Sequence, residues 1–306
     1  MQNFYSNGKL LITGEYVVLD GGLSLAVPTK FGQSLTVEPI NEPEISWKSY
    51  NSDSSVWFED TFSINEIASG FVNPRNDVSE RLIQILNAAK TLNPEFQNTN
   101  QGFKISTHLT FPKNWGLGTS STLINNIAQW AHVDAFELLE KTFGGSGYDI
   151  ACAQNNLPIT YQLDTARAKR TIKKVDFNTE FKDHLYFVYL NKKQNSRDGI
   201  ATYNTNKHSI ETVISEINTI TTQIINSKTL ESFEYLITQH ENIISKVIKQ
   251  KTAKELLFND FNGSIKSLGA WGGDFVLATS TENPTAYFKN KGFDVVVPYD
   301  DMVLKF

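Results

Sequence analysis

The chain has 306 residues, of which 40% are hydrophobic and 20% charged, and its formal net charge is −5. This length suits one large or two modest domains with a substantial core, and the acidic balance argues against a nucleic-acid groove or a polybasic membrane patch. The only cysteine, Cys152, excludes an intrachain disulfide. No apolar run reaches the roughly eighteen residues of a membrane helix, and strand-like sequence begins without a signal peptide, so we expect a cytoplasmic protein.

Residues 8–40 alternate short apolar runs with glycine-rich turns, a pattern typical of antiparallel strands. The run over residues 16–19 is interpreted as part of a strand, and Gly21-Gly22 after it predicts a hairpin. Residues 46–59 are rich in aromatic and polar residues and predict further strands. A helix should then begin at Ser79-Glu80 and end before Asn93-Pro94, with its apolar stripe formed by Leu82, Ile83, Leu86 and Ala89.

The central stretch, residues 112–122, joins a predicted strand over residues 102–110 to a predicted helix through small and hydroxylated residues. Gly116 and Gly118 would let the backbone approach a ligand closely, and the partial positive charge at the helix start favours a phosphate. The hydroxyls that follow can bind phosphate or magnesium. No Gly-Lys-Ser/Thr tripeptide occurs, so this is not a P-loop, and an ordinary strand-to-helix turn is the alternative.

A second glycine-rich segment, residues 144–147, is separated from Asp149 only by Tyr148. The turn would place one carboxylate at the start of a helix, where the helix dipole stabilises its charge. The alternative is that Asp149 only caps this helix.

The second half begins with predicted strands over residues 158–163 and 184–190, and we place a domain change near residue 165. Residues 192–198 carry three positive charges that could hold an anionic substrate or simply form solvated surface. Two amphipathic helices follow, marked by Ile210, Val213, Ile214, Ile217, Ile220 and Ile224, and by Phe233, Leu236, Ile237, Ile243, Ile244 and Val247. His240 is interpreted as a helix-surface or packing residue.

A third glycine-rich segment, residues 267–274, leads into an apolar strand and again permits close approach of a backbone. Strands over residues 293–297 and 302–306 should complete the fold.

Together these segments resemble the GHMP kinase superfamily, through residues 8–19 (GKLLITGEYVVL), 112–122 and 267–274. The middle segment is close to the family pattern P-x3-GLGSSA, with Thr119 and Ser120 at the paired serines. The resemblance implies an α+β fold of two domains with the site between them. Residues 1–165 would form an ATP-binding domain like domain 2 of ribosomal protein S5, and residues 166–306 a ferredoxin-like domain.

Within the family, three segments look like those of phosphomevalonate kinases: the Gly-Glu-Tyr of the first motif, residues 145–149, and the Gly-Gly-Asp that ends the third motif. Two departures stand out. Trp271 takes the place of a family glycine, and the glutamate that mevalonate kinases use as a second magnesium ligand has no clear counterpart, since Glu137 and Glu140 are only approximately placed.

The resemblance also implies ATP and Mg2+ as cofactors and assigns roles to particular residues. Asp149 is the candidate general base, or orients the attacking oxygen. Lys9 would lie near Asp149, although a surface lysine at a strand end is the alternative for Lys9. Ser120 would act in catalysis as a magnesium ligand. The ATP phosphates would lie on Gly116, Leu117, Gly118, Thr119, Ser120 and Ser121. The acceptor would meet Glu15, Lys193, Ser196, Arg197, Gly269, Ala270, Gly272 and Gly273.

The expected partner is a small anionic molecule, with no nucleic acid and no membrane, and a homodimer is left open. The leading hypothesis is an ATP-dependent kinase of the mevalonate pathway that prefers phosphomevalonate to mevalonate. Alternatives are a kinase acting on a sugar or an amino-acid alcohol, a diphosphomevalonate decarboxylase, and a GHMP-fold protein that binds without turnover, which Trp271 favours.

Overall fold

A computed structural model of the protein describes residues 1–69, 76–97, 101–164, 166, 169–177, 179–193, 196–207 and 210–305. The chain forms two compact units, each built from several segments. Unit 1 comprises Met1–Gly8, Phe31–Lys113 and Leu117–Gln154, and unit 2 comprises Lys9–Lys30, Asn114–Gly116 and Asn155–Phe306. The chain therefore passes between the units several times, and the simple division into residues 1–165 and 166–306 stays a prediction.

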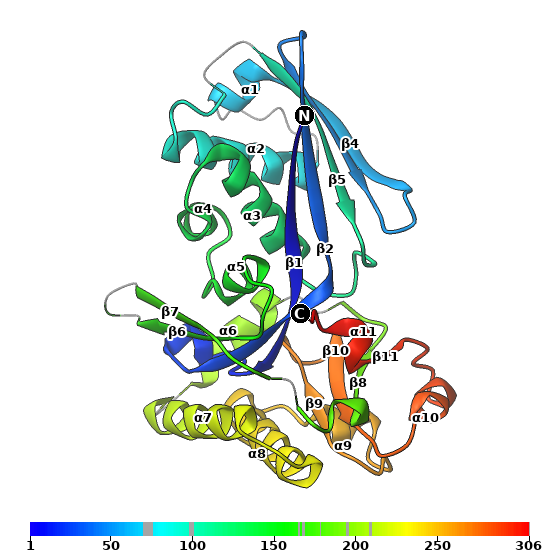
Figure 1. The fold of residues 1–306 in the computed structure, drawn as a ribbon. Helices are drawn as coiled ribbons and strands as arrows, with labels where there is room; N and C mark the ends of the chain where they lie inside the picture. Colours follow the sequence, from blue (N-terminus) through cyan, green and yellow to red (C-terminus); the bar gives the residue numbers. More distant parts are fainter. Residues whose placement is uncertain are drawn as a thin grey trace. The chain divides into compact units, whose positions relative to one another are not determined.

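The sheet of unit 1 is built from long strands whose side chains alternate between a buried and a more exposed face (Figure 1). Its neighbouring strands are β4 (Val56–Ser63), β3 (Glu44–Tyr50), β5 (Gly102–Leu109) and β2 (Ser24–Ile40), and β1 (Gln2–Thr13) pairs with β2. The β3–β5 pair is parallel, whereas β2–β5 and β3–β4 are antiparallel. The strands predicted within residues 46–59 are thus confirmed as β3 and β4.

The helices of unit 1 are α1 (Ile64–Ser69), α2 (Asp77–Leu92), α3 (Thr119–Ala131), α4 (Ala135–Thr142) and α5 (Tyr148–Ala153). Helix α2 begins two residues earlier than predicted because the Asn76 side chain caps it, accepting hydrogen bonds from the backbone N–H groups of Val78 and Ser79. It ends before Asn93-Pro94, as predicted. In Figure 1, α2, α3 and α4 lie side by side along the sheet.

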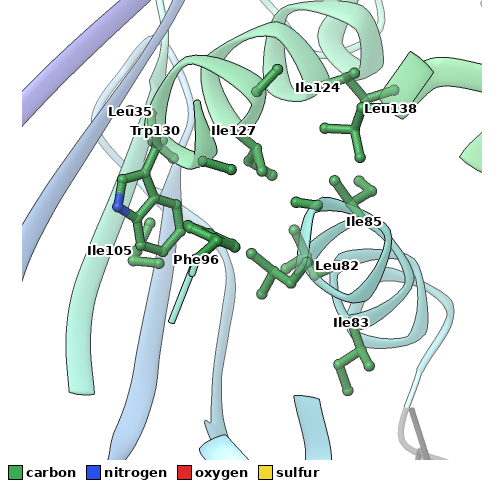
Figure 2. Packing of buried hydrophobic residues seen from close by; sticks show 14 of the residues in the cluster. Leu35, Leu82, Ile83, Ile85, Phe96, Ile105, Ile124, Ile127, Trp130 and Leu138 are labelled. Carbon is green, nitrogen blue, oxygen red and sulfur yellow. The ribbon is translucent and has the colours of Figure 1, made fainter. Parts of the chain in front are cut away.

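The core of unit 1 lies between these helices and the sheet (Figure 2). Leu82 and Ile85 of α2 face Ile124 and Ile127 of α3. The ring of Trp130 meets Phe96 edge-on, with 4.7 Å between ring centroids. The apolar stripe predicted for α2 is confirmed, since Leu82, Ile83, Leu86 and Ala89 are all buried.

Unit 2 contains the beginning of β2, paired with β6 (Ile159–Asp164), which pairs in turn with β7 (Lys169–Lys174). A separate antiparallel sheet has the order β11-β8-β10-β9. Its strands are β8 (Leu185–Tyr189), β9 (Ile265–Ser267), β10 (Phe275–Thr279) and β11 (Val296–Pro298). Apolar side chains fill both faces of β8 and β10, which are buried along their whole length.

The helices of unit 2 are α6 (Ser196–Asn206), α7 (Ile210–Ile225), α8 (Leu230–Ile248), α9 (Ala253–Leu257), α10 (Thr285–Asn290) and α11 (Tyr299–Met302), with 3-10 helices η1 (Val17–Asp20) and η2 (Lys182–His184). Helices α7 and α8 are the two predicted amphipathic helices and pack together (Figure 1). Among the described residues, no helix combines the length and apolarity needed to cross a membrane.

Two local predictions were wrong. Residues 17–20 form η1 and not a strand leading into a hairpin, because Val18 N–H bonds back to Gly14 and Tyr16 adopts a left-handed φ of 63°. Met302 ends helix α11, and within the described residues up to 305 an isolated bridge between Thr29 and Val303 follows in place of the predicted strand. Of the two interpretations of His240, a helix-surface residue or a packing residue, the structure supports the second, since His240 is fully buried.

Candidate functional site

The central glycine-rich segment brings the chain into helix α3 through two left-handed glycines. Gly116 has a φ of 70° and Gly118 a φ of 96°, a region that glycine adopts without steric cost. Gly118 is the N-cap of α3, and no side chain caps the helix there. The first turn holds no acidic residue. The helix start thus presents backbone N–H groups and a partial positive charge to a ligand.

The hydroxyls on this first turn differ in their accessibility. The side chain of Ser120 is exposed and that of Thr119 is half-buried. Ser121 is buried and donates its hydroxyl back to the carbonyl oxygen of Gly118 at 2.9 Å, as does Thr122 at 3.0 Å. Thr119 and Ser120 are therefore the hydroxyls most available for a phosphate or a cation.

Gly116 is the point in unit 2 where the first and third motifs meet the central one. The ammonium of Lys9 donates to the carbonyl oxygen of Gly116 at 2.9 Å. The carboxylate of Asp274 lies against the α-carbon of the same glycine. It is so close that a β-carbon at position 116 would be 2.4 Å from Asp274 Cγ. This proximity explains why the position holds a glycine.

Aromatic side chains hold residues 114–116 in unit 2. Trp115 meets Phe275 edge-on, with 5.4 Å between ring centroids. The hydroxyl of Tyr189 donates to the carbonyl oxygen of Asn114 at 3.0 Å. Burial, and secondarily the charge of Asp274, raise the pKa of Tyr189, so this hydroxyl keeps its proton and can donate.

The third motif is a tight turn between β9 and β10. Asp274 has a left-handed φ of 54°; its N–H donates to the Lys192 carbonyl at 2.7 Å and its carbonyl accepts from Leu190 N–H at 2.8 Å. The end of β8 therefore joins the same cluster. Of the glycine-motif residues predicted to meet the acceptor, Gly269 and Gly272 are in left-handed turns and Gly272 is exposed, whereas Ala270 and Gly273 are buried.

The ring of Trp271 lies in the apolar core of unit 2 beside Tyr16, Tyr203 and Ile244. Only 4% of the residue is exposed, and its backbone N–H donates to the hydroxyl of Tyr16 at 3.0 Å. Its indole N–H has no hydrogen-bond partner among the described residues. The side chain at the position of the family glycine is therefore accommodated by the core.

The side chain of Glu15, predicted to contact substrate, is only 1% exposed. Its Oε1 accepts from Lys266 Nζ at 2.5 Å, and Lys266 Nζ also lies 3.6 Å from Glu241. His240 Nε2 accepts the N–H of Gly14 at 2.9 Å, so the ring is neutral and its 3.4 Å approach to Glu15 is not an ion pair. Burial, opposed by Lys266, raises the pKa of Glu15 to about 7.

Two neighbouring groups are shifted by the same burial. The pKa of His240 is well below its usual range because of burial and of the nearby Lys266 charge. The pKa of Glu241 is raised, again chiefly by burial. The first motif is thus joined beneath the surface to the residue directly before the third motif, by a charged cluster in which Lys266 faces two carboxyl groups.

Asp149 lies in unit 1, in the first turn of α5, which follows Gly147 at a φ of 88°. Its carboxylate is half-buried and accepts from the N–H of Ile150 at 3.1 Å. Helix α5 packs on α3, so the segments that carry Ser120 and Asp149 belong to one packed pair of helices.

The basic segment after β8 is only partly described. Lys192 and Lys193 are exposed. The predicted roles of Ser196 and Arg197 lie outside the described residues, because only their backbone, at the start of α6, belongs to the described part. Among the described residues, no group of three or more His, Cys, Asp or Glu side chains is arranged to hold a metal ion.

Asp274, Tyr189 and Lys266 were not singled out in the sequence as site residues. The sequence offered only a charged residue directly after Gly-Gly, and a lysine directly before the third glycine-rich segment. Neither signal identifies its partner, because Gly116 and Glu15 are far away along the chain.

No protein-family model and no curated protein sequence matches the chain. Solved structures do match it. A mevalonate kinase is 17% identical with a TM-score of 0.72, covering 100% of each chain. Streptococcus pneumoniae phosphomevalonate kinase in complex with phosphomevalonate and AMPPNP is 16% identical with a TM-score of 0.69, covering 100% of this chain and 99% of that chain. Lactococcus lactis galactokinase complexed with galactose is 13% identical with a TM-score of 0.68, covering 95% of this chain and 88% of that chain.

Proposed function

Because the chain has the two-domain α+β fold of the GHMP kinases, we propose that it is an ATP-dependent kinase whose acceptor is phosphomevalonate or mevalonate. The observation that supports this most is that separate motifs meet at Gly116. Lys9 donates a hydrogen bond to the carbonyl oxygen of Gly116, and the carboxylate of Asp274 packs on the α-carbon of Gly116. An ordinary strand-to-helix turn has no need of two charged side chains from distant segments.

The start of α3 would hold the phosphates of ATP. Its uncapped N–H groups and the exposed hydroxyl of Ser120 are suited to phosphate oxygens and to a cation bound with them. When bound, magnesium neutralises charge on the phosphates. Thr119 would add a second hydroxyl, while Ser121 would contribute its backbone N–H, because its own hydroxyl is bonded to Gly118.

Asp149 would take the proton of the attacking acceptor oxygen or orient that oxygen. Its place in the first turn of α5 favours the charged carboxylate that this role needs. Lys9 would stabilise charge on the transferred group. Lys193, Ser196 and Arg197 remain the proposed ligands of an anionic acceptor.

Two other functions compete with this one. A kinase that phosphorylates a sugar or an amino-acid alcohol is supported by the galactokinase match, whose TM-score is almost that of the phosphomevalonate kinase. A protein that binds without turnover was favoured by Trp271, but the burial of that ring in the core removes the reason for expecting a blocked site.

The test is ADP release from Mg-ATP with mevalonate, phosphomevalonate, galactose and homoserine, with mass spectrometry of each product. One acceptor that gives turnover well above the ATP-only rate would support the proposal and identify the substrate. Nucleotide binding without any product would favour the binding protein, and release of carbon dioxide would favour a decarboxylase.

Variants sharpen the test. Asp149→Asn should fold normally and lose turnover by about a hundredfold or more; Ser120→Ala should lose about tenfold or need more magnesium. Asp260→Asn and Ser215→Ala make the same substitutions at exposed positions of unit 2 and should act like the wild type. Wild-type turnover of Asp149→Asn would exclude its role.

A further inference from the structure

The carboxylate of Asp274 lies flat against Gly116. A β-carbon at position 116 would be 2.4, 2.5 and 2.6 Å from Asp274 Cγ, Oδ2 and Oδ1. Such similar distances to all three carboxyl atoms mean that the group presents its face to the glycine. No other residue type fits at position 116 while Asp274 stays where it is.

Asp274 is itself held firmly in place. Its backbone has a left-handed φ of 54°, which aspartate adopts more readily than most other residues with a side chain, and the surroundings fix this conformation. Here the end of β8 does so, because Lys192 accepts from the N–H of Asp274 and the Asp274 carbonyl accepts from Leu190. The carboxylate is thus presented to Gly116 from a fixed backbone.

Gly116 is also close along the chain to the predicted phosphate site. Only Leu117, which is fully buried, separates it from Gly118, the N-cap of α3. A change of the backbone at Gly116 would therefore reorient the first N–H groups of the helix. Lys9 restrains the same glycine through its carbonyl oxygen.

We propose that Asp274 is a positioning residue for nucleotide binding: its carboxylate, together with Lys9, holds Gly116 in the left-handed turn that aims the start of α3 at the phosphates. This inference rests on the proposed function, since it concerns the same nucleotide site. Asp274 acts through Gly116 and needs no contact with the nucleotide.

The sign of the effect separates this role from simple electrostatics. A carboxylate near a phosphate site repels the phosphates, so removal of its charge alone would tighten nucleotide binding. Removal of a positioning contact would weaken binding instead. Asparagine and glycine both tolerate a left-handed φ, so Asp274→Asn and Asp274→Gly change the carboxylate without adding backbone strain.

The experiment measures the dissociation constant of AMPPNP by calorimetry, with Mg2+ and with EDTA, for wild type, Asp274→Asn, Asp274→Gly and the control Asp260→Asn. Asp260 is a carboxylate of the same unit that bonds Lys291 and Tyr287 at the surface. Amide hydrogen exchange of a peptide covering residues 113–118 is followed without nucleotide, and thermal melting verifies folding.

Positioning predicts that both Asp274 variants bind AMPPNP about tenfold more weakly with and without Mg2+, and that residues 113–118 exchange faster, while Asp260→Asn matches the wild type. Unchanged or tighter binding overturns the inference. Weakening only with Mg2+ also overturns it, because the carboxylate would then be a cation ligand. Failure of the wild type to bind AMPPNP overturns the proposed function and this inference with it, whereas failure of the variants alone to weaken binding leaves the proposed function intact.

Discussion

Replacement of Glu15 by glutamine should change how the stability of the protein depends on pH. The carboxylate of Glu15 is buried beside Lys266, and its Oε2 has no hydrogen-bond partner among the described residues. Burial raises its pKa from 4.5 to about 7. The folded chain therefore binds a proton there between these pH values that the unfolded chain does not bind.

The sign and size of the effect follow from this difference. The contribution of the Glu15 proton is fully present below about pH 4.5 and is lost as the pH rises through about 7. Between about pH 7.5 and about pH 5 the folded state should gain about 2 kcal/mol from it. Glutamine cannot titrate, so the Glu15→Gln variant should lack this gain.

His240 has the opposite effect on how stability depends on pH. The pKa of His240 is lowered in the folded state. Below about pH 6.5 the unfolded chain therefore binds a proton at His240 that the folded chain does not bind, and the free energy of unfolding decreases as the pH falls. This loss is common to the wild type and Glu15→Gln, so it cancels when the two are compared. The difference between their stabilities at each pH isolates the Glu15 proton.

The assay is urea denaturation of both proteins across this pH range, with infrared difference spectra to detect the carbonyl stretch of a protonated carboxyl group. Glu241→Gln is the control, since Glu241 also has a raised pKa. The Glu241→Gln variant should keep most of the pH dependence of stability that Glu15 causes. Parallel stability curves for wild type and Glu15→Gln, without a carboxylic acid band near neutral pH, would refute the reasoning.

Four further substitutions test the packing around the site. Lys266→Met leaves two buried carboxyl groups without a cation and should cost about 3–5 kcal/mol of stability. Part of this loss should be recovered in the double variant Lys266→Met with Glu15→Gln. If the two substitutions changed the free energy of unfolding in urea additively, the pairing of Lys266 with Glu15 would be contradicted. Gly116→Ala and Gly269→Ala both place alanine at a φ of 70°, but only position 116 meets Asp274. Gly269→Ala should thus cost about 1 kcal/mol and Gly116→Ala clearly more, and equal melting temperatures would count against the contact. Trp271→Ala should cost about 3–5 kcal/mol; a loss under about 1 kcal/mol would place the ring outside the core.

The sequence alone determined the features that depend on neighbours along the chain. The apolar stripes of α2, α7 and α8 follow from helical periodicity, and α2 ends where Asn93-Pro94 predicts. The three glycine-rich motifs, read together, indicated the GHMP kinase fold that the structural matches bear out.

Only the tertiary structure decided which distant residues meet. Asp274 follows Gly-Gly in a pattern that says nothing of Gly116, and the lysine that pairs with Glu15 is 251 positions away. Propensity and periodicity describe interactions over a few residues, whereas these contacts join segments that lie far apart in the sequence and meet only in the folded chain. For the same reason a helical histidine such as His240 could be recognised as a packing residue, but its complete burial over Gly14 could not be predicted.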